Sequence, residues 1–157
     1  MSKHLLNLRV NGKEYAVMVD SYDRLIDVLR NRLGLRGTKE GCGTGDCGTC
    51  VVIMNGKLVN SCLVLAMQAR NSTITTVEGI GTAERLHPLQ ETFIESGASQ
   101  CGYCIPGMLV TAKHLLDVNP HATEKDIKLA ISGVLCRCTG YTKIIKAIKD
   151  AQSRMTP

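Results

Sequence analysis

The sequence predicts an α+β protein, with a small mixed domain over residues 1–78 and a helical bundle over residues 79–157. Apolar residues alternate with polar ones in the strands expected in the first half, whereas they recur at helical spacing in the second half. Eight cysteines divide in the same way, with four in each half. The length of 157 residues is sufficient for two small domains.

Two hairpins, a helix and a closing strand are expected in the first domain. Alternating apolar residues flank both Asn11-Gly12 and Asn55-Gly56, and these dipeptides favour tight hairpin turns. Between the hairpins, a stretch of helical spacing ends at Gly34 and is followed by a glycine-rich loop over residues 36–50. The expected elements are a hairpin over 4–20, a helix over 25–33, a hairpin over 51–59 and a strand over 73–77.

Four helices are expected after a glycine-containing linker at residues 79–82. Asn119-Pro120 ends the second helix, and Thr123 with Asp126 resembles a capping box at the start of the third. The apolar stripes of these helices are interpreted as core packing. They comprise Leu89, Phe93 and Ile94; Ile105, Met108, Leu109, Ala112, Leu115 and Leu116; Ile127, Ala130, Ile131 and Val134; and Ile144, Ile145, Ile148 and Ala151.

The composition favours a cytoplasmic protein with metal or redox chemistry. The sequence shows no secretory signal and no apolar run of about 18 residues, so the eight thiols are expected in a reducing compartment, without membrane insertion. The formal charge of +5 counts every cysteine as neutral, and two thiolate-bound clusters would lower it by about four units. Aromatic residues make up only 3%, so few side chains could stack on bases and nucleic-acid binding is disfavoured.

The first cysteine group has the spacing of a known iron–sulfur ligand loop. Cys42, Cys47 and Cys50 follow the Cys-x4-Cys-x2-Cys pattern of plant-type 2Fe–2S sites, and Cys62 follows after the second hairpin. Glycines between them let a short loop wrap a small anion and bring backbone N–H groups close to it. A structural zinc site and a thioredoxin-like dithiol at Cys47 and Cys50 remain as alternatives, although neither explains all four cysteines.

The second group is Cys101-x2-Cys104 and Cys136-x-Cys138, which bracket the second and third expected helices. An antiparallel bundle could bring these two pairs together at one end. A Cys-x-Cys pair is unusual for zinc but can serve an iron–sulfur cluster. Four buried core cysteines are the alternative, which their position at glycine-rich helix ends argues against.

Three segments of the chain resemble the iron–sulfur subunit of the xanthine dehydrogenase family, the molybdenum hydroxylases. They are GCGTGDCGTC at residues 41–50, QCGYCIPGM at residues 100–108 and LCRCTGY at residues 135–141. The resemblance covers nearly the whole chain and includes all eight cysteine positions. Ile105 stands where threonine is common in the family.

The resemblance implies a ferredoxin-like β-grasp domain followed by a four-helix domain, each with one 2Fe–2S cluster. It further implies that Gln100 and the Cys138 thiolate lie against a pterin held by a partner subunit. The implied ligands are Cys42, Cys47, Cys50 and Cys62 for the first cluster, and Cys101, Cys104, Cys136 and Cys138 for the second.

By the same resemblance, the chain is an electron-transfer subunit of a molybdenum-dependent oxidoreductase. Molybdopterin is expected on a large subunit and FAD on a medium subunit, in a hetero-oligomer such as a dimer of heterotrimers. The residues agree, because the chain offers no phosphate-binding loop and no evident acid–base pair of its own. A free-standing two-cluster ferredoxin and a zinc-binding structural protein are the alternatives.

Overall fold

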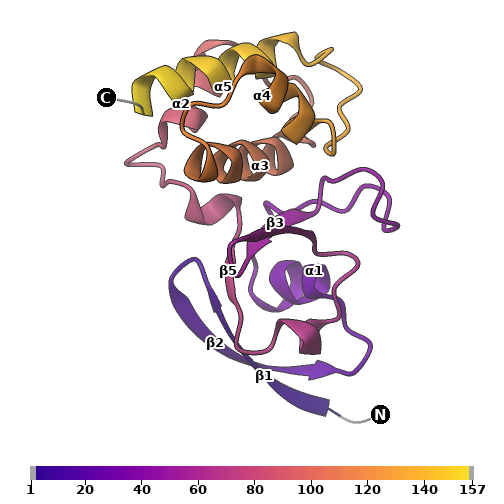
Figure 1. The fold of residues 1–157 in the computed structure, drawn as a ribbon. Coiled ribbons are helices and arrows are strands. Elements are labelled where there is room, and N and C mark those ends of the chain that lie inside the picture. The colour runs from indigo at the N-terminus through magenta and orange to yellow at the C-terminus, as the bar shows by residue number, and fades with distance from the viewer. Residues whose placement is uncertain (1–2, 156–157) are drawn as a thin grey trace.

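The computed structural model describes residues 3–155, and over this range a five-stranded sheet forms the first domain and helices form the second (Figure 1). The strands are β1 (Lys3–Val10), β2 (Lys13–Asp20), β3 (Val51–Met54), β4 (Lys57–Asn60) and β5 (Thr73–Thr75). Their order is β2-β1-β5-β3-β4, with β1 and β5 parallel and the other neighbours antiparallel. Both predicted hairpins are confirmed, and Asn11 and Asn55 at their turns have positive φ angles of 50° and 49°.

The closing strand is shorter than predicted. β5 pairs with its neighbours only as far as Thr75, and Val77–Gly79 then forms a 3-10 turn. The side chain of Asn11 holds the chain at this point. Its Oδ1 accepts a hydrogen bond from Thr76 N and its Nδ2 donates to Thr76 Oγ1, both at 2.9 Å. These bonds fix the direction in which the chain leaves the sheet.

The predicted helix over 25–33 forms as one α-helical turn, α1 (Leu25–Asp27), followed by a π-helical turn over Val28–Arg32. Leu33 N–H donates to Val28 O at 3.0 Å, a wider closure than the α-helical one. Leu25, Val28 and Leu29 pack into the sheet core, while Ile26 packs separately against two cysteines. Sequence spacing alone does not distinguish a π turn from an α turn.

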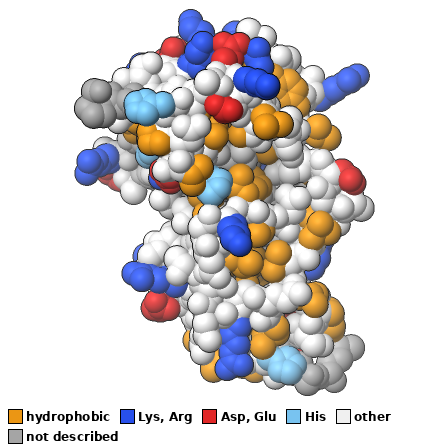
Figure 2. All heavy atoms as spheres, in the orientation of Figure 1, with side chains coloured by type: hydrophobic (Ala, Val, Ile, Leu, Met, Phe, Trp, Pro, Cys, Tyr) orange, Lys and Arg blue, Asp and Glu red, His pale blue; other side chains and the backbone are white. Residues whose placement is uncertain are grey.

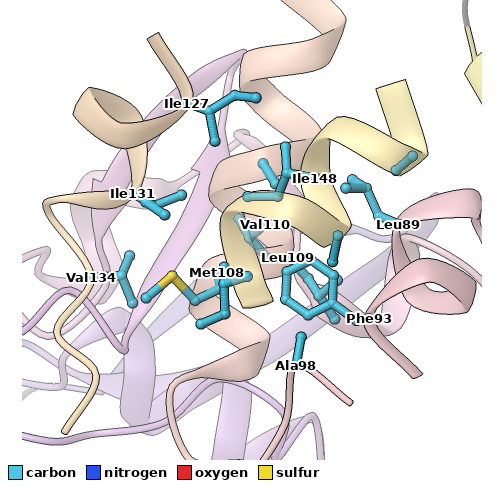
Figure 3. Close-up of a cluster of buried hydrophobic side chains, with 14 of the residues drawn as sticks. Leu89, Phe93, Ala98, Met108, Leu109, Val110, Ile127, Ile131, Val134 and Ile148 are labelled. Carbon is cyan, nitrogen blue, oxygen red and sulfur yellow. The ribbon is translucent and has the colours of Figure 1, made fainter. Parts of the chain in front are cut away.

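Four α-helices form the second domain within residues 3–155: α2 (Pro88–Glu95), α3 (Ile105–Val118), α4 (Glu124–Ile131) and α5 (Thr142–Met155). The capping box is confirmed, since Asp126 N–H donates to Thr123 Oγ1 and Thr123 N–H donates to Asp126 Oδ2. Phe93, Met108 and Ile148 meet in the core between the helices (Figure 3). The placement of Ile94 on the core stripe is wrong: it is 69% exposed, because the short α2 turns Leu89 and Phe93 inward.

The outer side of the helical domain is charged. Lys, Arg, Asp and Glu side chains gather there, at the top of the molecule in Figure 2. Glu124 of α4 pairs with Lys128 at 2.7 Å and with Lys149 of α5 at 2.9 Å. Within the part of the chain that the structure describes, no helix is long and apolar enough to cross a membrane.

The domains meet through their loops as well as through α3 and β3. Leu135 N–H, in the segment between α4 and α5, donates to Cys47 O at 2.9 Å. Beside this bond, a Cβ atom added at Gly48 would lie 1.9 Å from the Gly133 carbonyl oxygen. Gly48 also has a φ of +66°, which side-chain-bearing residues rarely adopt. The two backbones can therefore approach this closely only with glycine at position 48.

Gly48→Ala should destabilise the protein, since both the clash with the Gly133 carbonyl and the positive φ penalise a side chain. A strained backbone position costs about 1–3 kcal/mol, which lowers the Tm of a chain of this size by roughly 2–12 °C. The measurement is thermal unfolding by circular dichroism. Gly133→Ala is the matched control, because a Cβ atom there meets nothing within 4 Å. Equal Tm values for the two variants would contradict the proposed fit.

Candidate metal centres

The loop that carries the first cysteine group is held by two arginines of the α1 region. The Arg24 guanidinium donates to Asp27 at 2.8 and 3.0 Å and to Glu40 at 2.5 and 3.0 Å. These carboxylates, first Glu40 and then Asp27, raise the pKa of Arg24. Arg30 donates to Thr38 O at 2.6 Å. The loop is thus tied to the helix next to it before it reaches its first cysteine.

Cys42 lies exposed at the start of the ligand loop. Its Sγ accepts hydrogen bonds from the backbone N–H groups of Thr44 and Cys47, both at 3.4 Å. The loop can aim these amides inward because Gly43 and Gly45 adopt φ angles of +72° and +88°. The Thr44 side chain, followed by these two amides, lowers the pKa of Cys42 to about 6. The loop therefore favours a thiolate, which is the form that binds metal.

Cys50 and Cys62 are buried on the inner side of the same group and pack against Ile26. Ser61 fixes them: its Oγ donates to Cys50 O at 2.6 Å, and its own carbonyl accepts from Ile26 N–H at 3.2 Å. Burial, with further effects of Cys62, raises the pKa of Cys50 to about 11. A buried thiol of this kind ionises only when a cation compensates the charge.

The second group lies at the end of the helical domain nearest the sheet. Cys104 caps α3, and Cys101 Sγ lies 3.6 Å from Cys138 Sγ. Cys104 and Cys136 are the second pair of neighbouring thiols, and they influence each other electrostatically. The four thiols line a hollow of about 180 Å³ together with Thr49, Tyr103, Leu135 and Arg137.

The second group repeats the division into exposed and buried thiols. Cys101 and Cys138 are exposed, whereas Cys104 is buried. Burial, together with the neighbouring Cys136, raises the pKa of Cys104 to about 12. Burial also acts to raise the pKa of Cys136, but hydrogen bonds from Thr139 outweigh it and the pKa is lowered.

The thiols of both groups suit a two-iron cluster. A 2Fe–2S cluster takes two ligands on each of its irons, and in the second group the sulfurs already lie in two pairs. Within residues 3–155, no three His, Cys, Asp or Glu side chains converge as around a single metal ion. In the first loop the Gly41 backbone packs closely against Cys47, since a Cβ atom at Gly41 would lie only 2.8 Å from Cys47 Sγ.

The two groups face each other across the domain junction. The hydrogen bond from Leu135 N–H to Cys47 O joins the residue before Cys136 to a cysteine of the first group. Thr49, from the first ligand loop, lines the hollow of the second group. The eight predicted ligand residues therefore lie in two neighbouring groups.

Of the predicted site residues outside the two cysteine groups, Gln100 is exposed and directly precedes Cys101. The structure adds Thr44, whose backbone N–H donates to Cys42 Sγ, and Ser61, Thr139 and Tyr141, whose side chains bond to the cysteines or their backbone. Thr44 and Thr139 lie inside the cysteine motifs, which is the signal that could have drawn attention to them.

Two family descriptions match the chain, and together they span most of it. Residues 8–75 match the "2Fe-2S iron-sulfur cluster binding domain" and residues 76–149 match the "[2Fe-2S] binding domain". The matches confirm the fold class, a ferredoxin-like β-grasp domain followed by a helical cluster-binding domain. They also confirm that both domains are of the 2Fe–2S type.

Individual relatives match over almost their whole length. The chain is 49% identical to the nicotinate dehydrogenase small FeS subunit of Eubacterium barkeri, over 98% of each sequence. It is 44% identical to the nicotine 6-hydroxylase small subunit of Paenarthrobacter nicotinovorans, over 96% of this chain and 90% of that one. The structure of quinoline 2-oxidoreductase from Pseudomonas putida 86 superposes with a TM-score of 0.93 at 42% identity, covering 97% of this chain and 94% of the matched chain.

Metal analysis of the purified chain should give about four irons and four acid-labile sulfides, because eight thiols in two groups accommodate two such clusters. The purified chain should contain no stoichiometric zinc. About two irons per chain in undamaged protein would contradict the assignment of two clusters.

Cys50→Ser should remove or perturb one of two paramagnetic signals in the reduced protein and leave about two irons at the other site. The reason is that Cys50 packs with Ile26 and Cys62 in the first domain, whereas Cys104 of the second group belongs to the helical core. Electron paramagnetic resonance of the reduced protein is the measurement. The reciprocal variant Cys104→Ser should affect the other signal. Loss of both signals in a folded Cys50→Ser protein would show that the sites are not independent.

Proposed function

The chain belongs to the iron–sulfur small subunits of the molybdenum hydroxylase family, and we propose that it relays electrons from molybdopterin on a large subunit to FAD on another. Cys101, Cys104, Cys136 and Cys138 hold the cluster that receives electrons. Cys42, Cys47, Cys50 and Cys62 hold the cluster that passes them on. A cluster of this type accepts and releases one electron at a time, so two in series carry a two-electron oxidation in single steps.

The observation that carries this proposal is the exposure of the thiols. Cys101 and Cys138 are exposed in one group and Cys42 in the other, so each site has a side that a partner subunit can approach. Between the two sites, the backbones of Leu135 and Cys47 are joined by a hydrogen bond, and Thr49 of the first ligand loop lines the second site. Electrons can thus arrive at one exposed side and leave from the other through the interior of the chain.

The chain's own residues prepare each site for negative charge. Amide N–H groups of Thr44 and Cys47 donate to Cys42 Sγ, which stabilises the thiolate at the exposed side of the first site. Ile26 covers Cys50 and Cys62 and excludes water from the inner side. At the second site Thr139 Oγ1 lies 3.1 Å from Cys136 Sγ. A reducing compartment such as the cytoplasm keeps these thiols available for metal, and we place the chain there.

Gln100 is proposed as the contact to the pterin. It is exposed, it directly precedes Cys101, and the family resemblance assigns its position to the pterin-facing surface. A carboxamide can donate and accept hydrogen bonds at once, as the edge of a pterin requires. The exposed Cys138 thiol is assigned to the same surface.

Gln100→Ala should leave both clusters assembled, because it removes no ligand, and should impair coupling to the large subunit. Loss of one hydrogen bond in a buried interface costs about 1–3 kcal/mol, or roughly 5- to 150-fold in affinity or rate. The measurements are the Kd for the molybdenum-bearing subunit and the rate of cluster bleaching after mixing with that subunit in its reduced form. The neighbouring Ser99→Ala is the control and should behave as wild type.

Equal affinity and rate for Gln100→Ala and wild type would contradict the role of Gln100. A wild-type chain that keeps both clusters but does not bind the large subunit would favour a free-standing ferredoxin instead.

A further inference from the structure

Tyr141 has an unusual backbone conformation. Among the residues that the structure describes, four other than glycine have positive φ angles: Asn11, Asn55, Asn71 and Tyr141. Asparagine adopts this region readily, whereas a bulky side chain such as tyrosine rarely does. Such a conformation persists only where the surrounding contacts enforce it. Tyr141 has a φ of +66°, and its contacts include residues of the second cysteine group.

The Tyr141 hydroxyl holds the backbone of the Cys136 segment. It accepts a hydrogen bond from Cys136 N–H at 2.8 Å and donates to Val134 O at 3.3 Å. The backbone of Tyr141 reaches the sulfur as well, because its N–H donates to Thr139 Oγ1 at 3.2 Å and that oxygen lies 3.1 Å from Cys136 Sγ. A single residue thus fixes Cys136 through both its amide and its thiol.

The aromatic ring of Tyr141 is anchored in the helical domain. The ring is partly buried against the helical core, beside Ile131 of α4 and Ile145 of α5. The segment between these helices has no strand or helix of its own, yet it carries Cys136 and Cys138. Tyr141 therefore connects the rigid helices to the segment that supplies half of the second ligand group.

We propose that Tyr141 is a positioning residue of the second cluster, whose hydroxyl fixes the Cys136–Cys138 segment and helps to set the reduction potential. Of the function proposed above, this proposal requires only that these cysteines are cluster ligands. The hydroxyl also engages the Cys136 N–H. When the hydroxyl is removed, this amide becomes free to donate to sulfur. Such a bond favours the reduced, more negative state.

The test is Tyr141→Phe in the full chain with both clusters, which keeps the ring and changes only the hydroxyl. The second cluster should show an altered paramagnetic signal and an upward shift of its midpoint potential. Its release to an iron chelator should be about tenfold faster, as expected for loss of one hydrogen bond. The first cluster should be unchanged. Tyr15→Phe, in β2 of the other domain, is the control and should alter neither cluster.

Loss of the second cluster alone in Tyr141→Phe would also support the proposal. An unchanged signal, potential and release rate of that cluster would overturn it. If Tyr141→Phe does not fold, 3-fluorotyrosine placed at position 141 retains the hydroxyl but makes its oxygen a weaker acceptor. The potential of the second cluster should then shift, and no shift would overturn the proposal.

These measurements use the isolated chain and a chemical reductant, so they are independent of the partner subunits. Failure of the relay proposed above would leave them unaffected. A wild-type chain without a second cluster would instead refute the ligand assignment.

Discussion

The hydrogen bond from Leu135 N–H to Cys47 O joins the two cysteine-bearing loops directly, and the absence of a side chain at Gly48 makes it possible. Gly107 of α3 extends the same close fit, since a Cβ atom there would lie 3.1 Å from Gly48 O. Backbone contacts beside the predicted metal ligands thus fix the relative position of the two domains. The distance between the two sites depends on backbone contacts rather than on flexible side chains.

Three of the cysteine thiols have strongly shifted pKa values. At neutral pH Cys42, with its pKa lowered to about 6, is mostly a thiolate, whereas Cys50 and Cys104, with pKa values raised to about 11 and 12, are protonated. Cluster binding must therefore displace protons from Cys50 and Cys104 but hardly from Cys42. A bound cation compensates the charge that these two buried sulfurs then carry.

Features with a recognisable sequence signature, such as a turn dipeptide, a capping box or a ligand spacing, could be predicted, whereas features set by packing or by unusual backbone angles could not. The Asn-Gly turns and the Thr123 capping box depend on a few adjacent residues, and they form as expected. The cysteine spacing likewise indicated two metal sites, because a ligand loop is local. The exposure of Ile94 depends on the packing partners of its helix. The π turn over Val28–Arg32 and the hydrogen bond from Cys136 N–H to the Tyr141 hydroxyl depend on unusual backbone angles as well as on packing partners. Hydrophobic periodicity carries no information about such partners.

The order of the strands has a consequence for biosynthesis. β5, which joins the two hairpins into one sheet, ends at Thr75, so every strand of the first domain has been synthesised before any helix of the second. Domains commonly fold in this order as they leave the ribosome. During that interval the loop with Cys42, Cys47 and Cys50 stands without its later cover, since Leu135 has not yet been made. The first ligand loop is thus complete, and open to solvent on that side, before the second domain closes over it.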